Sequence, residues 1–260
     1  MKRSNSEVKS VVLDINKYHT FLRLMSMFKD ICKDIDIHDG IIRQKTSDGA
    51  CLIEIDLTYL ISDISVPLSF VAKKLDLLKV FLGQEVTIES TDKLIKISDR
   101  HSSFEFKKPS SNYIEKANRY VPADEIQHII NIADEDLILV TLITKTISDR
   151  IKTTAKVFEH NSIDISFRND MGIISMSKDS KDQHVDLVKD IPLEHNVSGD
   201  TVLSSTPFMI DHDGDIIFKM YGVNEKQALS QFKMIVDDIN MTIYHRSSLN
   251  VEQTSGDDDE

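Results

Sequence analysis

The sequence predicts an α+β protein with two similar domains, each carrying helices on one face of antiparallel sheets. Three observations support this fold class: short amphipathic helices, alternating strands between them, and a faint repeat of the first half in the second. Residues 17–57 are echoed by residues 145–188. Because an internal repeat determines the architecture, it takes precedence over any single motif.

Each copy of the repeat is expected to contain a helix, an alternating strand, a shared tripeptide and a further strand. In the first copy these are 17–28, 34–37, Gly40-Ile41-Ile42 and 50–57. In the second copy they are 145–158, 162–167, Gly172-Ile173-Ile174 and 183–188. A second part of each domain then begins, at Val66 in one and at Val202 in the other.

The predicted helices have a buried side and an open side. In the first helix, apolar residues recur at i, i+3, i+4 and i+7, as in a helix packed on one face; they are Phe21, Leu24, Met25 and Phe28. The second domain repeats this stripe with Ile147, Ile151, Ala155 and Phe158. A third helix at 70–82 should bury Phe70, Leu75, Leu78, Phe81 and Leu82. A fourth helix is expected near 206–213.

Alternating segments after these helices predict an antiparallel meander in each half. They are 85–89, 94–98 and 103–106 in the first half, and 215–220, 231–236 and 240–244 in the second. Residues 109–121 lack periodicity and are assigned to a connector between domains 1–108 and 122–250. Residues 251–260 form an acidic tail with nothing to bury, and we expect it to be disordered.

The composition excludes several classes of protein. With 40% hydrophobic and 28% charged residues, it is typical of a soluble globular chain. No apolar run approaches the roughly 20 residues that cross a bilayer, and the N-terminal residues lack a signal-peptide core. We therefore expect a cytoplasmic protein that does not contact a membrane. Cys32 and Cys51 are too far apart for a C-x-x-C site and are interpreted as buried thiols.

The net charge of −12, taken alone, argues against nucleic acid, whose binding depends on Lys and Arg. The charge is unevenly placed, however, because the helices are locally basic while the strands and tail hold the acids. Lys145, Lys152 and Lys156 are spaced i, i+7 and i+11, so they share a face that cannot be the buried one. One such face is ordinarily only solvated. Three basic helices in an acidic chain make this ordinary interpretation less favoured.

The sequence offers little support for an enzyme. It contains no G-x-G-x-x-G or G-x-x-x-x-G-K-[ST] loop, no G-x-S-x-G elbow and no H-E-x-x-H helix. The densest polar cluster is 211–215, which lacks the spacing and closing Glu of an EF-hand. A turn before a strand is the favoured interpretation of that cluster. We therefore expect no catalytic residues, no metal site and no cofactor.

This order of elements resembles that of the DNA polymerase sliding clamps. The most specific stretch comprises 65–70, the helix to Leu82 and the meander over 85–106. Lys107-Lys108-Pro109 is similar to the start of the family's connector, and 122–130 to the segment that opens its second domain. The similarity is greatest to the trimeric two-domain clamps of tailed phages and to their relative, proliferating cell nuclear antigen.

The resemblance covers nearly the whole chain and implies a function. It implies clamp-fold domains that assemble into a homotrimeric ring around duplex DNA, with helices lining the hole. Such a ring is a non-enzymatic processivity factor, which a clamp loader places on DNA and which tethers the replicative polymerase. Sliding requires phosphate contacts that are weak and independent of sequence.

The resemblance also implies three sets of site residues. By position, the DNA-facing set is Lys17, Arg23, Lys29, Lys73, Lys74, Lys79, Lys145, Arg150, Lys152 and Lys156. Pairing of edge strands between subunits implies contacts by Ser103, Phe104, Phe106, Ile174 and Val185. A pocket for partner peptides beside the connector implies Ala50, Tyr113, Ile114, Tyr120, Tyr244 and Leu249. The fourth helix departs from the pattern, since it has Asp211, His212 and Asp213 but no lysine.

Alternatives remain open at this point. Tyr113 and Tyr120 could equally pack the connector onto the domains rather than line a pocket. A monomeric or dimeric viral processivity factor could bind DNA electrostatically on an open basic face. An oligomeric β-rich scaffold would have no DNA role, and its function would not depend on Lys145, Lys152 or Lys156.

Overall fold

The structure is a computed structural model that describes residues 8–29, 31–32, 34–62, 64–68, 71–109, 121, 136–159, 162–168, 170–177, 184–194, 197–224 and 226–251. The chain divides into two compact units. Unit 1 comprises residues 1–126 and 236–241, and unit 2 comprises residues 127–235 and 242–260. The predicted connector, apart from Pro109 and Val121, and the predicted tail beyond Val251 lie outside the described residues.

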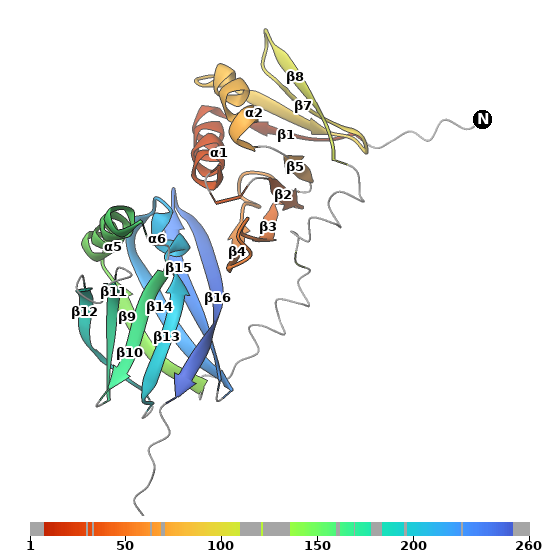
Figure 1. Cartoon of the computed structure of the whole chain (residues 1–260). Coiled ribbons are helices and arrows are strands. Elements are labelled where there is room, and N and C mark those ends of the chain that lie inside the picture. Colours follow the sequence, from red (N-terminus) through yellow and green to blue (C-terminus); the bar gives the residue numbers. More distant parts are fainter. Residues whose placement is uncertain are drawn as a thin grey trace, which may run out of the picture. The chain divides into compact units, whose positions relative to one another are not determined.

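Within the described residues, the same order of strands and α-helices occurs twice along the chain (Figure 1). The first series is β1 (Lys9–Leu13), α1 (Ile15–Phe28), β2 (Ile35–His38), β3 (Ile41–Lys45), β4 (Cys51–Asp56), β5 (Val66–Leu68), α2 (Val71–Leu78), the 3-10 helix η1 (Lys79–Phe81), β6 (Val86–Ser90), β7 (Leu94–Ser98) and β8 (Ser103–Lys107). The second is β9 (Leu137–Ile143), α5 (Lys145–Phe158), β10 (Ser162–Arg168), β11 (Met171–Ser177), β12 (His184–Pro192), β13 (Gly199–Ser204), α6 (Thr206–Met209), β14 (Asp213–Asn224), β15 (Gln227–Val236) and β16 (Ile239–Val251).

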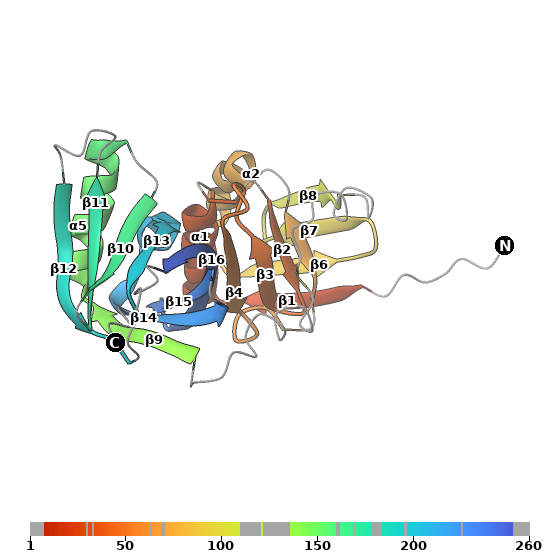
Figure 2. The same cartoon turned by 60° about the horizontal axis from the view of Figure 1, so that its bottom comes forward.

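The sheets repeat as well, as two views of the ribbon show (Figures 1 and 2). Strand order β4-β3-β2-β5 in the first series matches β12-β11-β10-β13 in the second. Order β1-β6-β7-β8 likewise matches the run β9-β14-β15-β16. Neighbouring strands whose register is resolved pair antiparallel. The predicted α+β class, with helices beside antiparallel sheets, is confirmed.

At the first helix and the first hairpin the two copies are offset by 130 positions, whereas the sequence pattern aligned Lys17 with Lys145 and Gly40 with Gly172. Asp14 and Thr144, which are 130 positions apart, are the two N-caps, and each accepts a hydrogen bond from a backbone N–H three residues on. The first hairpin pairs His38 with Ile41, and its counterpart pairs Arg168 with Met171. Gly40 therefore lies in a turn, whereas Gly172 lies inside β11. The shared tripeptide is not structurally equivalent in the two copies, so that part of the prediction was wrong.

Helix burial follows the predicted stripes in α1 and only partly in α5. Phe21, Leu24, Met25 and Phe28 are all buried, as predicted. In α5, Ile151 and Ala155 are buried but Ile147 and Phe158 are half-buried. Each helix begins at its capping side chain because that oxygen satisfies a backbone N–H that has no partner within the helix.

The second helix of each copy is shorter than predicted. The segment 70–82 forms α2 followed by η1, and Leu82 lies outside both helices with 53% of its surface exposed, contrary to the prediction that it is buried. The predicted helix 206–213 is a single turn, α6, because β14 begins at Asp213. Phe208 of α6 packs edge-on against Phe232, which stacks on Phe218 with ring centroids 4.8 Å apart. These rings anchor the short helix to the core of unit 2.

Candidate nucleic-acid interface

Each unit places two helices next to each other beside its sheets. In unit 1 the pair is α1 and α2, and in unit 2 it is α5 and α6 (Figure 1). The ten residues predicted to face DNA all lie on, or directly beside, α1, α2, η1 or α5. The structure therefore confines these cations to one helix pair in each unit.

The cations of unit 1 differ in how much of their charge is open to a ligand. The Lys17 ammonium lies over the ring of Tyr59, 4.7 Å from its centroid. Arg23 is ion-paired with Asp237, which belongs to the same unit. Lys79 is 3.5 Å from the Asp76 carboxylate. Lys29 is exposed at the end of α1.

The remaining two cations of unit 1 lie on α2. Lys73 is exposed, whereas Lys74 is half-buried with its ammonium 5.3 Å from the centroid of the Phe106 ring. Burial lowers the pKa of Lys74. Its aliphatic stem thus covers an aromatic side chain of β8, so Lys74 contributes packing as well as charge.

The cations of unit 2 lie along α5. Lys145, at its first position, contacts the carboxylates of Asp149 at 2.7 Å and of Asp211 at 3.8 Å. Arg150 and Lys156 are exposed and Lys152 is half-buried. Among the described residues, none of these three has a carboxylate within ion-pair distance. The positive charge of α5 is thus most available beyond its first turn.

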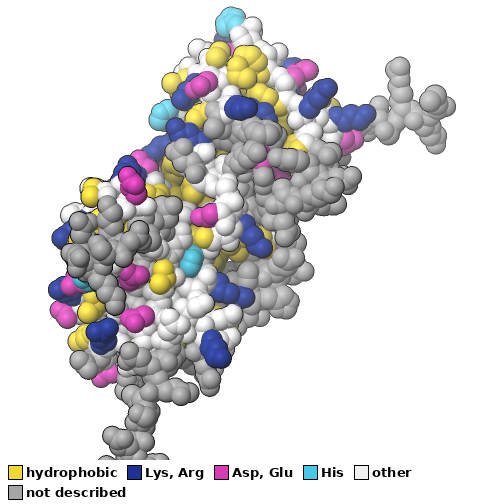
Figure 3. Space-filling model, in the orientation of Figure 1, with side chains coloured by type: hydrophobic (Ala, Val, Ile, Leu, Met, Phe, Trp, Pro, Cys, Tyr) yellow, Lys and Arg dark blue, Asp and Glu magenta, His cyan; other side chains and the backbone are white. Residues whose placement is uncertain are grey.

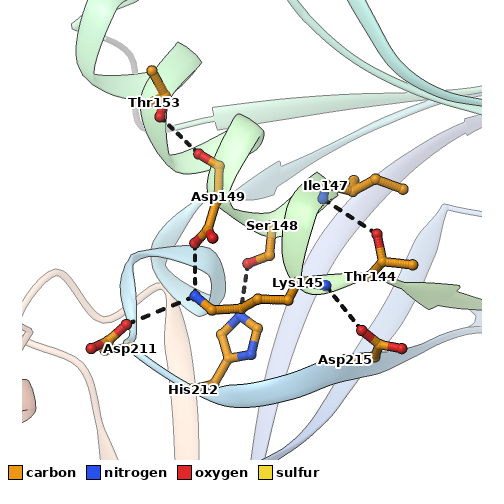
Figure 4. A network of polar contacts seen from close by, with 9 residues as sticks. All are labelled: Thr144, Lys145, Ile147, Ser148, Asp149, Thr153, Asp211, His212 and Asp215. Atoms are coloured by element: carbon orange, nitrogen blue, oxygen red, sulfur yellow. Dashed lines mark hydrogen bonds and ion pairs between the residues drawn. The ribbon is translucent and has the colours of Figure 1, made fainter.

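The segment after α6 is acidic and is tied to α5 (Figure 4). His212 is buried, and its Nε2 lies 2.8 Å from the Ser148 hydroxyl. Burial, followed by the nearby Lys145 ammonium, lowers the pKa of His212. The Asp215 carboxylate accepts a hydrogen bond of 3.0 Å from the Lys145 backbone N–H. In the part of the chain that is described, no cluster of His, Cys, Asp or Glu has the arrangement of a metal site.

The residues predicted at subunit contacts fall on two outer strands and one inner strand. Ser103, Phe104 and Phe106 belong to β8, the last strand in the order β1-β6-β7-β8. Val185 belongs to β12, the last strand of the other sheet type. Ile174 lies in β11, which pairs with both β10 and β12, and its side chain is 1% exposed. Its backbone is therefore not at a sheet edge.

Half of the predicted partner pocket can be placed. Ala50 is half-buried at the end of the β3–β4 turn, while Tyr244 and Leu249 of β16 are buried. Tyr113, Ile114 and Tyr120 lie outside the described residues. The end of the predicted connector is fixed by a hydrogen bond of 2.9 Å from the Val121 N–H to the Arg43 carbonyl.

Sequence reasoning did not find the partners of the cations. The Lys145–Asp149 pair has the i, i+4 spacing that favours contact on a helix, so its signal was present in the sequence. Asp211, by contrast, reaches Lys145 from a segment 66 positions later. Tyr59, 70% exposed beside Lys17, carried no periodic signal at all.

The fold is similar to that of solved DNA sliding clamps. Proliferating cell nuclear antigen (PCNA) from Entamoeba histolytica matches with a TM-score of 0.59 and 10% identity, over 93% of this chain and 98% of that one. PCNA from A. fulgidus, solved with the C-terminal region of FEN-1, matches with a TM-score of 0.57 and 9% identity, over 94% and 99%. The H. pylori beta clamp, solved with 5-chloroisatin, matches with a TM-score of 0.62 and 12% identity.

These similarities define the class of fold: the chain has the sliding-clamp fold, as the resemblance in sequence predicted. The alignment covers nearly all of each PCNA chain but 68% of the beta clamp, so the chain has the extent of a PCNA subunit. No protein-family model and no curated protein matches the chain in sequence. Within the described residues, no helix is long and apolar enough to cross a membrane.

Proposed function

We propose that this protein is a DNA sliding clamp, a homotrimeric ring that encircles duplex DNA and tethers the replicative polymerase. The observation that carries the proposal is the repeated unit itself, in which each copy of a clamp fold presents a basic helix beside its sheets. Similarity to PCNA over more than nine-tenths of the chain supports the same architecture. The assignment to phage-type clamps rests on the sequence pattern.

The charge distribution suits sliding rather than site recognition. Exposed cations on the helices can meet phosphates one at a time, and such contacts are independent of base sequence. Lys29, Arg150 and Lys156 are the exposed examples on α1 and α5. The net charge of −12 keeps the rest of the surface from binding DNA. Processivity then comes from topology, since the ring cannot leave the duplex sideways.

Ring closure is assigned to β8 of one copy and β12 of the next. Both strands stand at the end of their sheet order, and an outer strand offers unpaired N–H and C=O groups. Each has exposed apolar side chains on the helix nearby: Leu77 and Val80 next to β8, where Phe81 packs on Phe104, and Val157 on α5, which contacts β12. Three copies of a two-unit chain give six units.

Partners bind, in this proposal, through short peptides with hydrophobic anchors. The resemblance in sequence assigns Ala50, Tyr244 and Leu249, with residues of the connector, to the pocket for the polymerase and the clamp loader. The protein acts in the cytoplasm as a scaffold, with no catalytic residue and no cofactor of its own.

Two measurements test the proposal. Light scattering behind a sizing column, over a range of concentrations, should give a mass near three times the 29.6 kDa of one chain. Loaded protein should then remain on circular DNA in high salt but slide off linear DNA. A strictly monomeric mass, with DNA binding that falls steeply with salt, would favour the open-face processivity factor instead.

A further inference from the structure

A network of polar contacts joins the segment 211–215, which runs from the loop after α6 into β14, to the start of α5 (Figure 4). We call it the α5 clasp; its members are Lys145, Ser148, Asp149, Asp211, His212 and Asp215. Three links cross from the segment to the helix: Asp211 to the Lys145 ammonium, His212 to the Ser148 hydroxyl, and Asp215 to the Lys145 N–H. Asp149, one turn further along α5, holds the same ammonium.

Lys145 stands where a helix least favours a cation. The start of a helix carries partial positive charge, so an ammonium there is stabilised only if carboxylates surround it. Two carboxylates contact it, and a third binds its backbone N–H. The hydrogen bond from Lys145 lowers the pKa of Asp149. The environment therefore explains the lysine without any external ligand.

The clasp as a whole is negative. One ammonium is set against three carboxylates, those of Asp149, Asp211 and Asp215, so the net charge is −2 while His212 is neutral. Each exposed ion pair is weak, and Lys145 could part from one acid. A phosphate that approached it would still meet the remaining carboxylates well within a screening length of about 8 Å.

The rest of α5 differs. Arg150, Lys152 and Lys156 have no carboxylate within ion-pair distance among the described residues, and Arg150 and Lys156 are exposed. On the face of unit 2 seen in Figure 3, acidic and basic side chains are interspersed. The residue of α1 that corresponds to Lys145 is Ile15. At this position the first copy therefore has an apolar side chain in place of the lysine.

We propose that Lys145 is a structural residue, and that the carboxylates of the α5 clasp keep the DNA backbone away from the start of α5. Phosphate contacts of unit 2 then begin at Arg150 and continue through Lys152 and Lys156. The carboxylates of Asp149 and Asp211 repel phosphates. They therefore lower the affinity of the ring for DNA and shift the duplex away from the start of the helix. The inference rests on the sliding-clamp function proposed above.

The test is the salt dependence of binding to a linear duplex, because the slope of log K against log salt changes by about 0.9 for each phosphate that the protein neutralises. Lys156→Ala should flatten the slope by that amount. Lys145→Ala should leave the slope unchanged while lowering the melting temperature. Asp211→Asn should steepen the slope and raise affinity severalfold, because Lys145 is partly released. Asp200→Asn, at an exposed position of β13, changes the net charge equally and should leave the slope unchanged.

The outcomes separate this inference from the proposed function. If Lys145→Ala flattens the slope as Lys156→Ala does, Lys145 contacts phosphate and the inference is overturned. Should Lys145→Ala fail to fold, the isosteric Asp211→Asn decides alone, since an unchanged or weaker affinity in that variant also refutes the inference. If the wild-type protein binds no DNA under any salt condition, the sliding-clamp function itself fails.

Discussion

The two units show how far one fold can diverge while its order of elements and its first helix cap stay the same. α1 buries six of its fourteen residues, among them Tyr18, Phe21 and Phe28, whereas α5 of equal length buries Ser148, Ile151 and Ala155. The capping position and the strand order are nevertheless the same in both. The sheets and caps therefore determine where the helix lies, and the side chains beneath it are free to change in size.

A pair of matched positions shows the same principle in polar chemistry. Tyr18 donates a hydrogen bond of 2.7 Å to the Leu78 carbonyl at the end of α2. Its counterpart 130 positions later, Ser148, bonds instead to His212 beyond α6. Each contact ties the first helix to the segment of the second. Only the second contact contains a group that titrates near neutral pH.

The largest difference between the units should come from the core beneath the first helix. Phe21→Ala should destabilise the protein by about 3–5 kcal/mol, and the matched Ile151→Ala by less, because a phenyl ring leaves the larger cavity. Urea unfolding followed by circular dichroism measures both. Equal losses would mean that the two helices are packed equally well despite their different burial.

A smaller effect is expected at the first hairpin turn. Gly40 has φ of +80°, and a Cβ there would lie 2.3 Å from the Ile61 carbonyl oxygen. Gly40→Ala should therefore cost more than about 2 kcal/mol, since a left-handed backbone alone costs roughly 1–2 kcal/mol. The matched Asp170 already holds a side chain at φ of 61°, so Asp170→Ala should cost less than about 1 kcal/mol. Thermal unfolding of the two variants tests this, and a mild Gly40→Ala would show that Ile61 can move.

The next smaller difference is expected in the stability that the two matched hydrogen bonds, Ser148–His212 and Tyr18–Leu78, contribute. Ser148→Ala leaves the buried His212 without that partner and should cost about 1–3 kcal/mol. Tyr18→Phe removes one neutral donor and should cost about 1 kcal/mol. A double-mutant cycle of Ser148→Ala with His212→Asn measures the coupling free energy between the two side chains. If the cycle shows no coupling, the contact does not stabilise the fold.

The smallest expected effect is the pH dependence of stability, which His212 causes in the second unit. Because the pKa of His212 is lowered in the folded state, its neutral form stabilises the fold above the ordinary value of 6.5. Below that pH the unfolded chain binds the proton first, so stability falls until the folded pKa is reached. Lys145 and Asp149 of α5 and Asp211 of its own segment face the imidazole. Acidification should destabilise the wild type more than His212→Asn; parallel pH profiles would contradict this.

Local patterns predicted much of this molecule from sequence. The helix 145–158 and the buried stripe of α1 follow from apolar spacing, which depends only on neighbours along the chain. The offset at the first hairpin was missed because Gly40 and Gly172 look alike in sequence, but Gly40 lies in the turn whereas Gly172 lies in the strand after it. The length of α6 was missed because β14 competes for the same residues.

The sequence predicted which residues of the candidate site are cationic, but not which of these cations are already in contact with other side chains of the chain. Spacing placed the cations on helices, yet Asp211 reaches Lys145, and Tyr59 reaches Lys17, from distant segments. Contacts of this kind depend on tertiary packing, which no local window contains. The same limit applies to Ile174, whose apolar character cannot distinguish an inner strand from an outer one.

The two strands assigned to ring closure, β8 and β12, belong to different units and are not alike. In the proposed ring, a contact between them would join unlike surfaces, so each copy would use β8 on one side and β12 on the other. A copy whose β8 is blocked still offers β12. Such a copy would join an assembly through β12 and prevent the next copy from adding. A small fraction of this variant in a mixture should therefore prevent closure of a larger fraction of the rings.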